Sequence, residues 1–338
     1  MSVTTGDLHI ATTTADDTDT RLDRWLRRRV PGLIQAHLEK LLRNGRIRVD
    51  DRIAKANTRL QPEQAVSWPA DLATAVAPPP KPKISAGPNA AAEREVARLQ
   101  ALVLYRDADV LVLNKPAGLA VQGGTGTSRH LDAMLDALKF EASERPRLVH
   151  RLDKDTSGVL ILARSVFAAA KLAEAFRSKT CRKTYCALTA GVPNPFQGRI
   201  DLALSRRPDA AHGARITADE KDGQSAVTLY QVLDHAGKRA ALVAMWPLTG
   251  RTHQLRVHMA ELGTPILGDD RYGITRDPEV SPVGGGLSKR LHLHAFRLEI
   301  PHPRSRKLID VQAPFPPDLV ASCRWLGFQI PNEVIFPE

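Results

Sequence analysis

Cysteine is scarce in this chain, and its spacing excludes the roles that cysteine most often has. The 338 residues contain three cysteines, Cys181, Cys186 and Cys323. Because their number is odd and no pair has C-x-x-C spacing, we expect neither a disulfide framework nor a zinc site. Long apolar runs are missing as well: none approaches the ~20 residues of a membrane-spanning helix, and no apolar signal segment follows Met1. We therefore expect a soluble cytoplasmic protein with no membrane partner.

Acidic residues are fewer than basic ones. Lys and Arg number 48 against 37 Asp and Glu, which gives a formal charge of +11 and a pI near 9.8. Such a charge favours a polyanionic partner, of which nucleic acid is the simplest. The chain is long enough, and at 43% apolar residues hydrophobic enough, for one large domain and one small one.

The segment most informative about chemistry is residues 150–158, His-Arg-Leu-Asp-Lys-Asp-Thr-Ser-Gly, which is followed by the apolar stretch 159–163. The apolar stretch predicts a buried strand, so the polar segment forms a loop anchored by that strand. Neighbouring cations favour the ionised form of Asp153, while the adjacent leucine indicates partial desolvation. Such a carboxylate is a nucleophile. The alternative is a turn stabilised by polar side chains, without catalytic function.

A second string, residues 248–258, reads Leu-Thr-Gly-Arg-Thr-His-Gln-Leu-Arg-Val-His. Together the two strings resemble the H-R-L-D-x-x-T-S-G and G-R-T-H-Q-[IL]-R-V-H motifs of the RluA family of RNA pseudouridine synthases. Shorter matches at residues 114–118, 183–185 and 265–269 extend the resemblance over about residues 102–303. Residues 115–124, with the N-terminal domain described below, resemble the large-subunit ribosomal RNA branch, particularly RluC-like enzymes.

The resemblance implies an enzyme that isomerises uridine to pseudouridine, with Asp153 as its essential catalytic residue. Tyr185 matches the active-site tyrosine of the family, although a half-buried strand tyrosine is the alternative. Arg256, in preference to Arg251, is expected beside the aspartate, where a cation keeps the carboxylate ionised. Arg151 is expected either to fill the space left by the flipped uridine or to bind phosphate, and Arg251 to contact RNA.

No cofactor is expected for this reaction, because the isomerisation consumes no redox equivalent and no external group. The sequence contains neither G-x-G-x-x-G nor G-x-x-x-x-G-K-[ST]. The glycine-rich residues 123–127 lack the lysine of a phosphate-binding loop, and we interpret them as a mobile loop on the substrate side or as a plain flexible segment. The pairs His253 and His258, and His292 and His294, raise the alternative of a metal-dependent hydrolase. A spacing of five does not align two ligands on a helix and no H-E-x-x-H is present, so we expect core or RNA-facing histidines and no metal.

The hydrophobic pattern of the larger part predicts an α+β fold. Strands are expected at residues 102–105, 110–113, 159–163, 184–188, 226–232, 240–246 and 291–299, and helices at residues 130–140, 166–178 and 252–262. A gap of hairpin length at residues 106–109 predicts antiparallel pairing. The family resemblance implies the pseudouridine-synthase fold, with a mixed, mainly antiparallel sheet and a central cleft.

The N-terminal part has a different pattern. Residues 20–30 and 34–43 predict two amphipathic helices, and residues 46–49 a short strand. About residues 20–68 resemble the RNA-binding domain named after ribosomal protein S-four. Arginines on one face of a helix pair meet phosphates, whereas the alternative is an ordinary solvated charged surface. The predicted RNA-binding side chains here are Arg21, Arg24, Arg28, Arg43, Arg46 and Arg48.

These patterns predict four parts: a flexible arm at residues 1–18, an S-four-type RNA-binding domain at 19–70, a proline-rich linker at 71–95 and a pseudouridine synthase domain at 96–330. We expect ribosomal RNA, with the large subunit favoured, as the partner of a monomer with no obligate protein partner. A pseudouridine synthase acting on transfer or messenger RNA, and a non-catalytic ribosome assembly factor, are the alternatives. Residues 213–225 and 277–286 match no motif and are expected to be loops that shape the choice of RNA.

Overall fold

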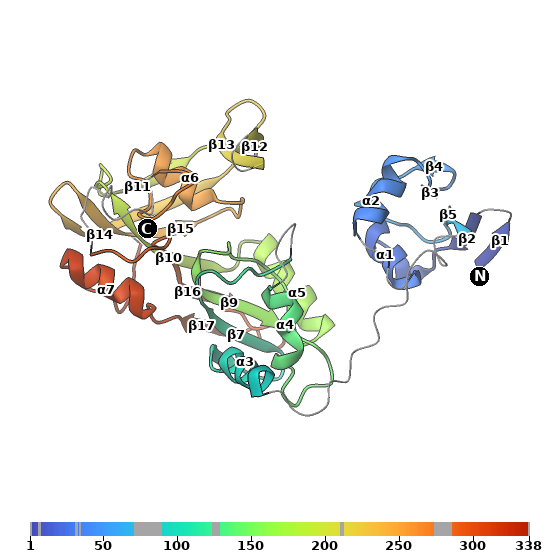
Figure 1. Ribbon diagram of the computed structural model, residues 1–338, viewed down its shortest axis with the longest axis horizontal. Helices are drawn as coiled ribbons and strands as arrows, with labels where there is room; N and C mark the ends of the chain where they lie inside the picture. Colours follow the sequence, from blue (N-terminus) through green and yellow to red (C-terminus); the bar gives the residue numbers. More distant parts are fainter. Residues whose placement is uncertain are drawn as a thin grey trace. The chain divides into compact units, whose positions relative to one another are not determined.

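The computed structural model describes residues 2–5, 8–30, 33, 35–70, 90–123, 129–209, 213–273 and 286–336 (Figure 1). The chain divides into two compact units, Met1–Gly87 and Pro88–Glu338. Most of the expected linker, residues 71–89, lies outside the described residues. Its last part was predicted wrongly, because Ala90–Gln100 form a helix, α3, that places Leu99 in the core of the second unit.

The first unit is a five-stranded antiparallel sheet with two helices. The strands are β1 (Ser2–Thr5), β2 (Leu8–Thr12), β3 (Arg48–Val49), β4 (Arg52–Ile53) and β5 (Ala65–Pro69), in the order β1-β2-β5-β3-β4. The helices are α1 (Leu22–Arg29) and α2 (Gln35–Arg43), with a 3-10 turn, η1, at Ala15–Asp17. The apolar stripe of α1 packs Leu22, Trp25 and Leu26 into a buried core, as the helical spacing predicted.

A flexible N-terminal arm is not what the structure shows. Strand β2 pairs along its whole length with β5, from Leu8 opposite Pro69 to Thr12 opposite Ala65. Ala11 is buried in the core, and the hydroxyl of Thr13 donates a hydrogen bond of 2.6 Å to the Gln61 carbonyl. Threonine is favoured in strands, and here the backbone groups of this Thr-rich segment form hydrogen bonds with a strand far along the chain.

The second unit is built on a ten-stranded sheet, in the part of the chain that the structure describes. Its order is β11-β14-β15-β10-β16-β9-β7-β6, with β17 paired to β16 and β8 to β9. The strands are β6 (Val103–Arg106), β7 (Val110–Lys115), β8 (Arg147–Leu148), β9 (Ser157–Ala163), β10 (Arg182–Ala190), β11 (Gln197–Asp201), β14 (Val227–Ala236), β15 (Ala240–Pro247), β16 (Leu293–Pro301) and β17 (Leu308–Gln312). All pairs are antiparallel except β16 with β9. The predicted mixed, mainly antiparallel α+β fold is therefore confirmed.

Helices cover both faces of this sheet (Figure 1). The remaining elements are α4 (Leu131–Met134), the 3-10 helix η3 (Leu135–Leu138), α5 (Val166–Arg177), α6 (Gln254–Glu261), α7 (Pro317–Leu326) and a separate hairpin of β12 (Leu204–Asp209) and β13 (Gly213–Ala218). Alternate residues of β9 enter two different cores. Val159 and Ile161 pack with α5, whereas Leu160 and Leu162 pack with α3, α4 and η3. Burial on both faces explains the unbroken apolar run at this strand.

The junction of β9 and β16 sets the geometry of the loop before β9. Gly158 has φ of 113°, and a Cβ atom there would overlap the backbone of Ala295 on β16. Glycine is therefore required where the two strands approach each other. Ser157 and Gly158 pair with His294 and Ala295, which fixes the end of the loop that carries Asp153. Within the described residues, no helix combines the length and apolar character needed to cross a bilayer.

Candidate active site

The two motif strings line one cavity of about 720 Å³ in the second unit. The loop before β9 supplies residues 149–153, and the segment from the end of β15 to the start of α6 supplies residues 246–256. The end of α5 and the start of β10 complete the wall. The predicted catalytic residues Asp153, Tyr185 and Arg256 come from distant segments to this cavity, which Arg151 and Arg251 also line.

Asp153 lies on a turn, with its backbone carbonyl accepting a hydrogen bond of 3.2 Å from the amide of Thr156. Its side chain is 20% exposed, so the carboxylate is partly desolvated yet still open to the cavity. Tyr185, on β10, is close enough to sense its charge. Burial, and next the negative charge of Asp153, raise the pKa of the Tyr185 phenol, which keeps the hydroxyl protonated at neutral pH.

Arg256 lies on the first turns of α6, and its ion-pair partner is Asp269. Its Nε donates to Oδ2 of Asp269 at 2.7 Å and its Nη2 to Oδ1 at 2.6 Å, and both residues are buried. Burial works to lower the pKa of Arg256, but the hydrogen bonds and charge of Asp269, with a smaller contribution from Asp153, raise it. The guanidinium is thus a permanent cation within electrostatic reach of Asp153, held by a second carboxylate.

His253 lies beside Asp153 in the cavity and is not among the catalytic residues that the sequence predicted. Its Nε2 is 3.8 Å from Oδ2 of Asp153, and its Nδ1 is 2.7 Å from the hydroxyl of Tyr272. Burial lowers the pKa of His253, against an opposing effect of the Asp153 charge, so the ring is neutral near pH 7. The residue has φ of 54° at the N-cap of α6, an unusual conformation for histidine. The place of His253 in the second string was the available signal, whereas the spacing of the histidines predicts a core or RNA-facing residue.

His150, the first residue of the first string, supports the loop from behind. Its Nε2 accepts a hydrogen bond of 3.0 Å from the amide of Ile161, and its ring lies 4.8 Å from that of Phe176. Burial, helped by the charge of Lys183, lowers the pKa of His150 to about 3. The imidazole is therefore neutral at pH 7 and can accept this hydrogen bond.

Lys115, at the end of β7, holds the same loop from another direction. Its fully buried ammonium donates to three carbonyl oxygens, of Pro116 at 2.9 Å, Leu119 at 2.8 Å and Lys154 at 3.0 Å. The Lys154 carbonyl also accepts from the amide of Gly118 at 2.9 Å. Burial lowers the pKa of Lys115 to about 7. The 114–118 match therefore corresponds to a segment that fixes the residue after Asp153.

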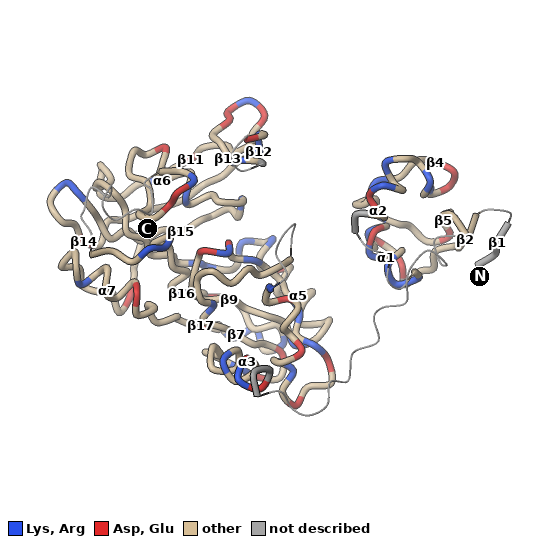
Figure 2. The backbone as a smooth tube through the Cα atoms, viewed as in Figure 1, with Lys and Arg blue, Asp and Glu red and all other residues tan. Residues whose placement is uncertain are grey.

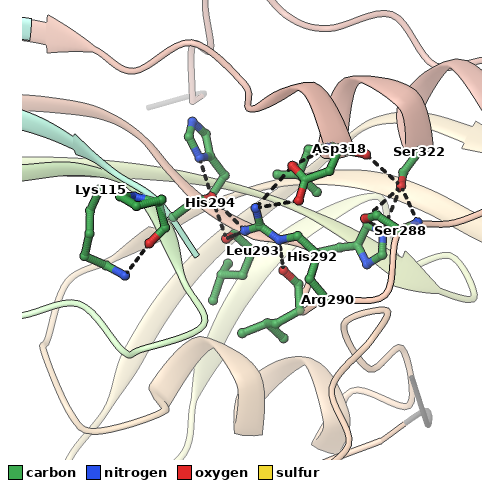
Figure 3. A network of polar contacts seen from close by, with 12 residues as sticks. Lys115, Ser288, Arg290, His292, Leu293, His294, Asp318 and Ser322 are labelled. Carbon is green, nitrogen blue, oxygen red and sulfur yellow. Dashed lines mark hydrogen bonds and ion pairs between the residues drawn. The ribbon is translucent and has the colours of Figure 1, made fainter. Parts of the chain in front are cut away.

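A buried polar network anchors the other end of the loop (Figure 3). Nη2 of Arg290 donates to Oγ of Ser157 at 2.7 Å, and Nδ1 of His294 is 2.8 Å from the same oxygen. Arg290 also reaches the carboxylate of Asp318 on α7, with both oxygens at 3.4 Å from Nη1. Figure 3 shows this chain of contacts continuing from the backbone carbonyl of Asp318, through the hydroxyl of Ser322, to His292 and Ser288. Because the hydroxyl of Ser157 is hydrogen-bonded inside the core, the loop that carries Asp153 has a fixed position where it joins the start of β9.

The histidine pairs make hydrogen bonds to protein groups. Nε2 of His294 lies 3.1 Å from the Ala313 carbonyl, Nδ1 of His292 lies 3.1 Å from the Leu267 carbonyl, and Nδ1 of His258 is 3.0 Å from the Thr228 hydroxyl. All three rings are buried. Over the described ranges, no cluster of three or more His, Cys, Asp or Glu residues has the geometry to hold a metal ion.

The predicted RNA-binding arginines of the first unit differ in whether their side chains already have hydrogen-bond or ion-pair partners. Arg21 donates two hydrogen bonds to Asp23, and Arg28 lies 3.7 Å from Asp17, so acidic side chains of the same unit already pair with these two arginines. Arg48 donates to backbone carbonyls. Arg24, Arg43 and Arg46 are exposed and have no side-chain hydrogen bond or ion pair among the contacts of the described residues. Figure 2 shows Lys and Arg, drawn in blue, on both α1 and α2.

Three predicted loops have different outcomes. Residues 124–127 of the glycine-rich segment and residues 277–285 lie outside the described residues. Residues 213–225 are not only a loop, because Gly213–Ala218 form β13, which pairs with β12 in full register. The predicted loop begins after this hairpin.

Known proteins with similar sequences identify the family. Residues 109–261 match the model of the family described as RNA pseudouridylate synthase. "Ribosomal large subunit pseudouridine synthase C" of Escherichia coli K12 is 35% identical over 325 residues, which cover 93% of this chain and 95% of the relative. This chain belongs to the RNA pseudouridylate synthase family. The Rickettsia conorii protein of the same name is 36% identical over 278 residues, or 81% of this chain and 87% of the relative.

Solved structures agree with this membership. "Human RNA Pseudouridylate Synthase Domain Containing 4" superposes with a TM-score of 0.58 at 31% identity, over 71% of this chain and 98% of that chain. "Human RNA Pseudouridylate Synthase Domain Containing 1" gives 0.51 at 31% identity, over 64% of this chain and 85% of that chain. The resemblance to the RluA family and the pseudouridine-synthase fold predicted from the motif strings are thus confirmed.

Proposed function

We propose that this enzyme converts uridines of large-subunit ribosomal RNA into pseudouridine, with Asp153 as the catalytic carboxylate. The observation that carries the proposal is the meeting of Asp153, Tyr185 and Arg256 in one cavity. The names of the relatives that match over most of this chain support the ribosomal substrate. Such an enzyme would work in the cytoplasm, where ribosomal RNA is modified in bacteria such as Escherichia coli and Rickettsia conorii.

The reaction breaks the bond between N1 of uracil and C1′ of ribose and joins C5 to C1′. C5 loses a proton and N1 gains one, so the atoms balance without a cofactor. An attack on C1′, an addition to the base and the removal of a ribose proton all need an ionised carboxylate. The partly exposed side chain of Asp153, with the Arg256 guanidinium in electrostatic reach, meets that need.

The other cavity residues have distinct tasks in this proposal. Tyr185 stacks its ring on the uracil, and its protonated hydroxyl can donate to the base or to water. Arg256 places a positive charge within electrostatic reach of Asp153, while Asp269 fixes the orientation of the guanidinium. Arg151 is exposed at the cavity, and a long planar cation there can take the place of a base that leaves its stack.

The first unit would bind RNA as an S-four-type domain. Arg24, Arg43 and Arg46 are among its exposed cations without side-chain partners in the described residues, and they support contacts to phosphate oxygens. Such contacts position an enzyme on structured RNA without reading its sequence. Arg251, whose Nε donates to the Ser225 carbonyl at 3.1 Å, has the same task at the cavity.

The proposal is tested by mapping pseudouridine in RNA that the purified protein has treated. Unmodified transcripts of large-subunit rRNA, small-subunit rRNA and a tRNA pool are incubated with the wild type and with Asp153→Asn. We expect new pseudouridines in large-subunit rRNA with the wild type alone. Modification restricted to tRNA would reject the substrate, and tight binding of rRNA without any isomerisation would favour an assembly factor. The same map of rRNA from cells with and without the gene checks the site in vivo.

A further inference from the structure

The wall of the cavity formed by α5 and β10 carries basic side chains that none of the assignments above uses. Arg177 is the last residue of α5, Lys179 follows it, and Lys183 is the second residue of β10. Arg177 and Lys179 are exposed, whereas Lys183 is only partly so. With Arg151, Arg251 and Arg256, they give six cationic residues around a cavity whose only carboxylate among its lining residues is Asp153.

Lys183 is the deepest of the three residues and has no anion to balance it. Its Nζ lies 5.9 Å from the centroid of the Phe176 ring, and a Cβ atom at Gly250 would be 3.8 Å from it. Among the contacts of the described residues, Lys183 has no hydrogen bond and no ion pair. Two titratable groups interact with its charge, and both are neutral: burial raises the pKa of the Cys181 thiol and lowers the pKa of the His150 ring.

Among the ion pairs of the described residues, none joins Lys183 to Asp153, whose contact of this kind is with His253 at 3.8 Å. The charge of Asp153 affects the pKa values of Tyr185, His253 and Arg256, whereas that of Lys183 is lowered by burial, with only Cys181 acting in the other direction. Lys183 and Tyr185 are one strand repeat apart, which is about 7 Å along β10. A base that stacks on Tyr185 would therefore have its own backbone within reach of Lys183.

We propose that Lys183 binds a phosphate of the RNA strand adjacent to the target uridine, and that Arg177 and Lys179 continue this phosphate path to the cavity rim. The inference rests on the proposed function and adds a backbone-binding site to it. Leaving a partly buried cation without a counter-ion is costly, and a phosphate oxygen removes that cost while making a charge-assisted hydrogen bond. The bound phosphate fixes the ribose of the target nucleotide relative to Asp153.

Neutral backbone linkages give the sharpest test. A short stem-loop substrate is made as a series in which one linkage at a time is methylphosphonate, with 2′-O-methyl on the preceding ribose for chemical stability. Each RNA is compared with its phosphate counterpart carrying the same ribose change. Binding to Asp153→Asn protein measures every linkage without turnover, and single-turnover rates with Asp153 present measure the linkages that leave the target ribose unmodified.

With Lys183 present, we expect one methylphosphonate linkage next to the target uridine to weaken RNA binding much more than the others do, by roughly 10- to 100-fold. Lys183→Met should bind the all-phosphate RNA more weakly by a similar factor and be insensitive to that linkage, because its partner is already lost. Lys183→Arg should keep most of the affinity. Lys307→Met removes the same charge at an exposed site outside the cavity and should keep the wild-type pattern.

A Lys183→Met protein that keeps the full wild-type sensitivity at every linkage would overturn the proposal. Lys183→Gln serves as a second neutral variant if the methionine variant does not fold, and thermal unfolding establishes this first. The binding series is independent of the reaction. An enzyme that isomerises no RNA would reject the proposed function while the linkage pattern still decides the role of Lys183, and normal activity with unaltered linkage sensitivity would reject only the phosphate site.

Discussion

Arg256 makes its two short hydrogen bonds to Asp269, at 2.7 and 2.6 Å, and not to the proposed catalytic aspartate. One guanidinium therefore interacts with two carboxylates. Asp269 orients it through hydrogen bonds, and Asp153 interacts with its charge at longer range. Asp269 also accepts the backbone amides of Arg271 and Tyr272, at 3.0 and 3.1 Å. The Pro-Ile-Leu-Gly-Asp string of residues 265–269 thus supplies the carboxylate that holds Arg256 in position.

Asp269→Asn should destabilise the protein strongly. The substitution leaves the Arg256 charge buried without its counter-ion, a change that costs about 3–5 kcal/mol in the free energy of unfolding. Urea denaturation gives that value. Asp310→Asn is the matched control, since Asp310 accepts two equally short hydrogen bonds from Arg297 but its side chain is 40% exposed, where the loss is about 1 kcal/mol or less. Equal losses at the two positions would contradict the role of Asp269.

Asp153→Asn should abolish pseudouridine formation and leave RNA affinity unchanged or slightly improved. The amide keeps the size of the side chain and removes only the negative charge, which repels phosphate. Single-turnover assays and filter binding on the same stem-loop measure the two quantities. Turnover at the wild-type rate would reject Asp153 as the catalytic residue, and a large loss of affinity would mean that the substitution disturbs the RNA-binding surface.

Stability should fall steeply as the pH drops from 6.5 toward 4.5. Burial lowers the pKa of His150 to about 3 and those of His292 and His294 to about 4, whereas the unfolded values are about 6.5. In this window the unfolded chain binds protons that the folded chain does not, so their stabilising effect is present above the unfolded pKa and is lost as pH falls.

Each such histidine contributes about 1.4 kcal/mol per pH unit, or about 4 for the three. Hydrogen exchange of the β9 amides in urea reports on this unit. His294→Asn should reduce the slope by roughly one third. A free energy of unfolding that does not change between pH 6.5 and 4.5 would contradict the neutral buried histidines.

Local sequence patterns were enough for the elements near the motifs. The run at β9 is apolar on both faces, and the stripes of α1 and α5 have helical spacing, so their positions were predicted within a few residues. Strand β11 was missed because alternate residues are exposed and it carries Gly198. Helix α7 was missed because it begins with two prolines, Pro316 as N-cap and Pro317, which are typical of both loops and helix starts.

Partners far apart in the sequence could not be predicted in the same way. Strand β2 pairs with β5, which is more than 50 residues away, so the local sequence of the Thr-rich segment did not reveal the partner that makes it a strand. The pairing of Arg256 with Asp269 and the approach of His253 to Asp153 follow from how α6 packs on the sheet. The family resemblance predicted that the two motif strings meet at one site, but it did not show which charges would pair.

The last prediction concerns the exposed arginines of the first unit. The full-length variant with Arg24→Gln, Arg43→Gln and Arg46→Gln should bind structured RNA more weakly and with a flatter salt dependence. Each lost phosphate contact lowers the slope of log affinity against log salt by about 0.9 on a duplex-like site, so three contacts lower it by about 2.7. Activity should return at high enzyme concentration, because these residues position the RNA and do not take part in the reaction.

The control removes the same charge elsewhere. Lys238→Gln, Lys289→Gln and Lys307→Gln change three exposed lysines of the second unit that do not line the cavity. Net charge falls equally in both triple variants, so a general loss of electrostatic attraction would flatten both slopes alike. A flatter slope for the arginine variant alone identifies direct phosphate contacts. If the arginine variant kept the wild-type slope, α1 and α2 would not touch RNA, and the S-four-type assignment of the first unit would lose its functional basis.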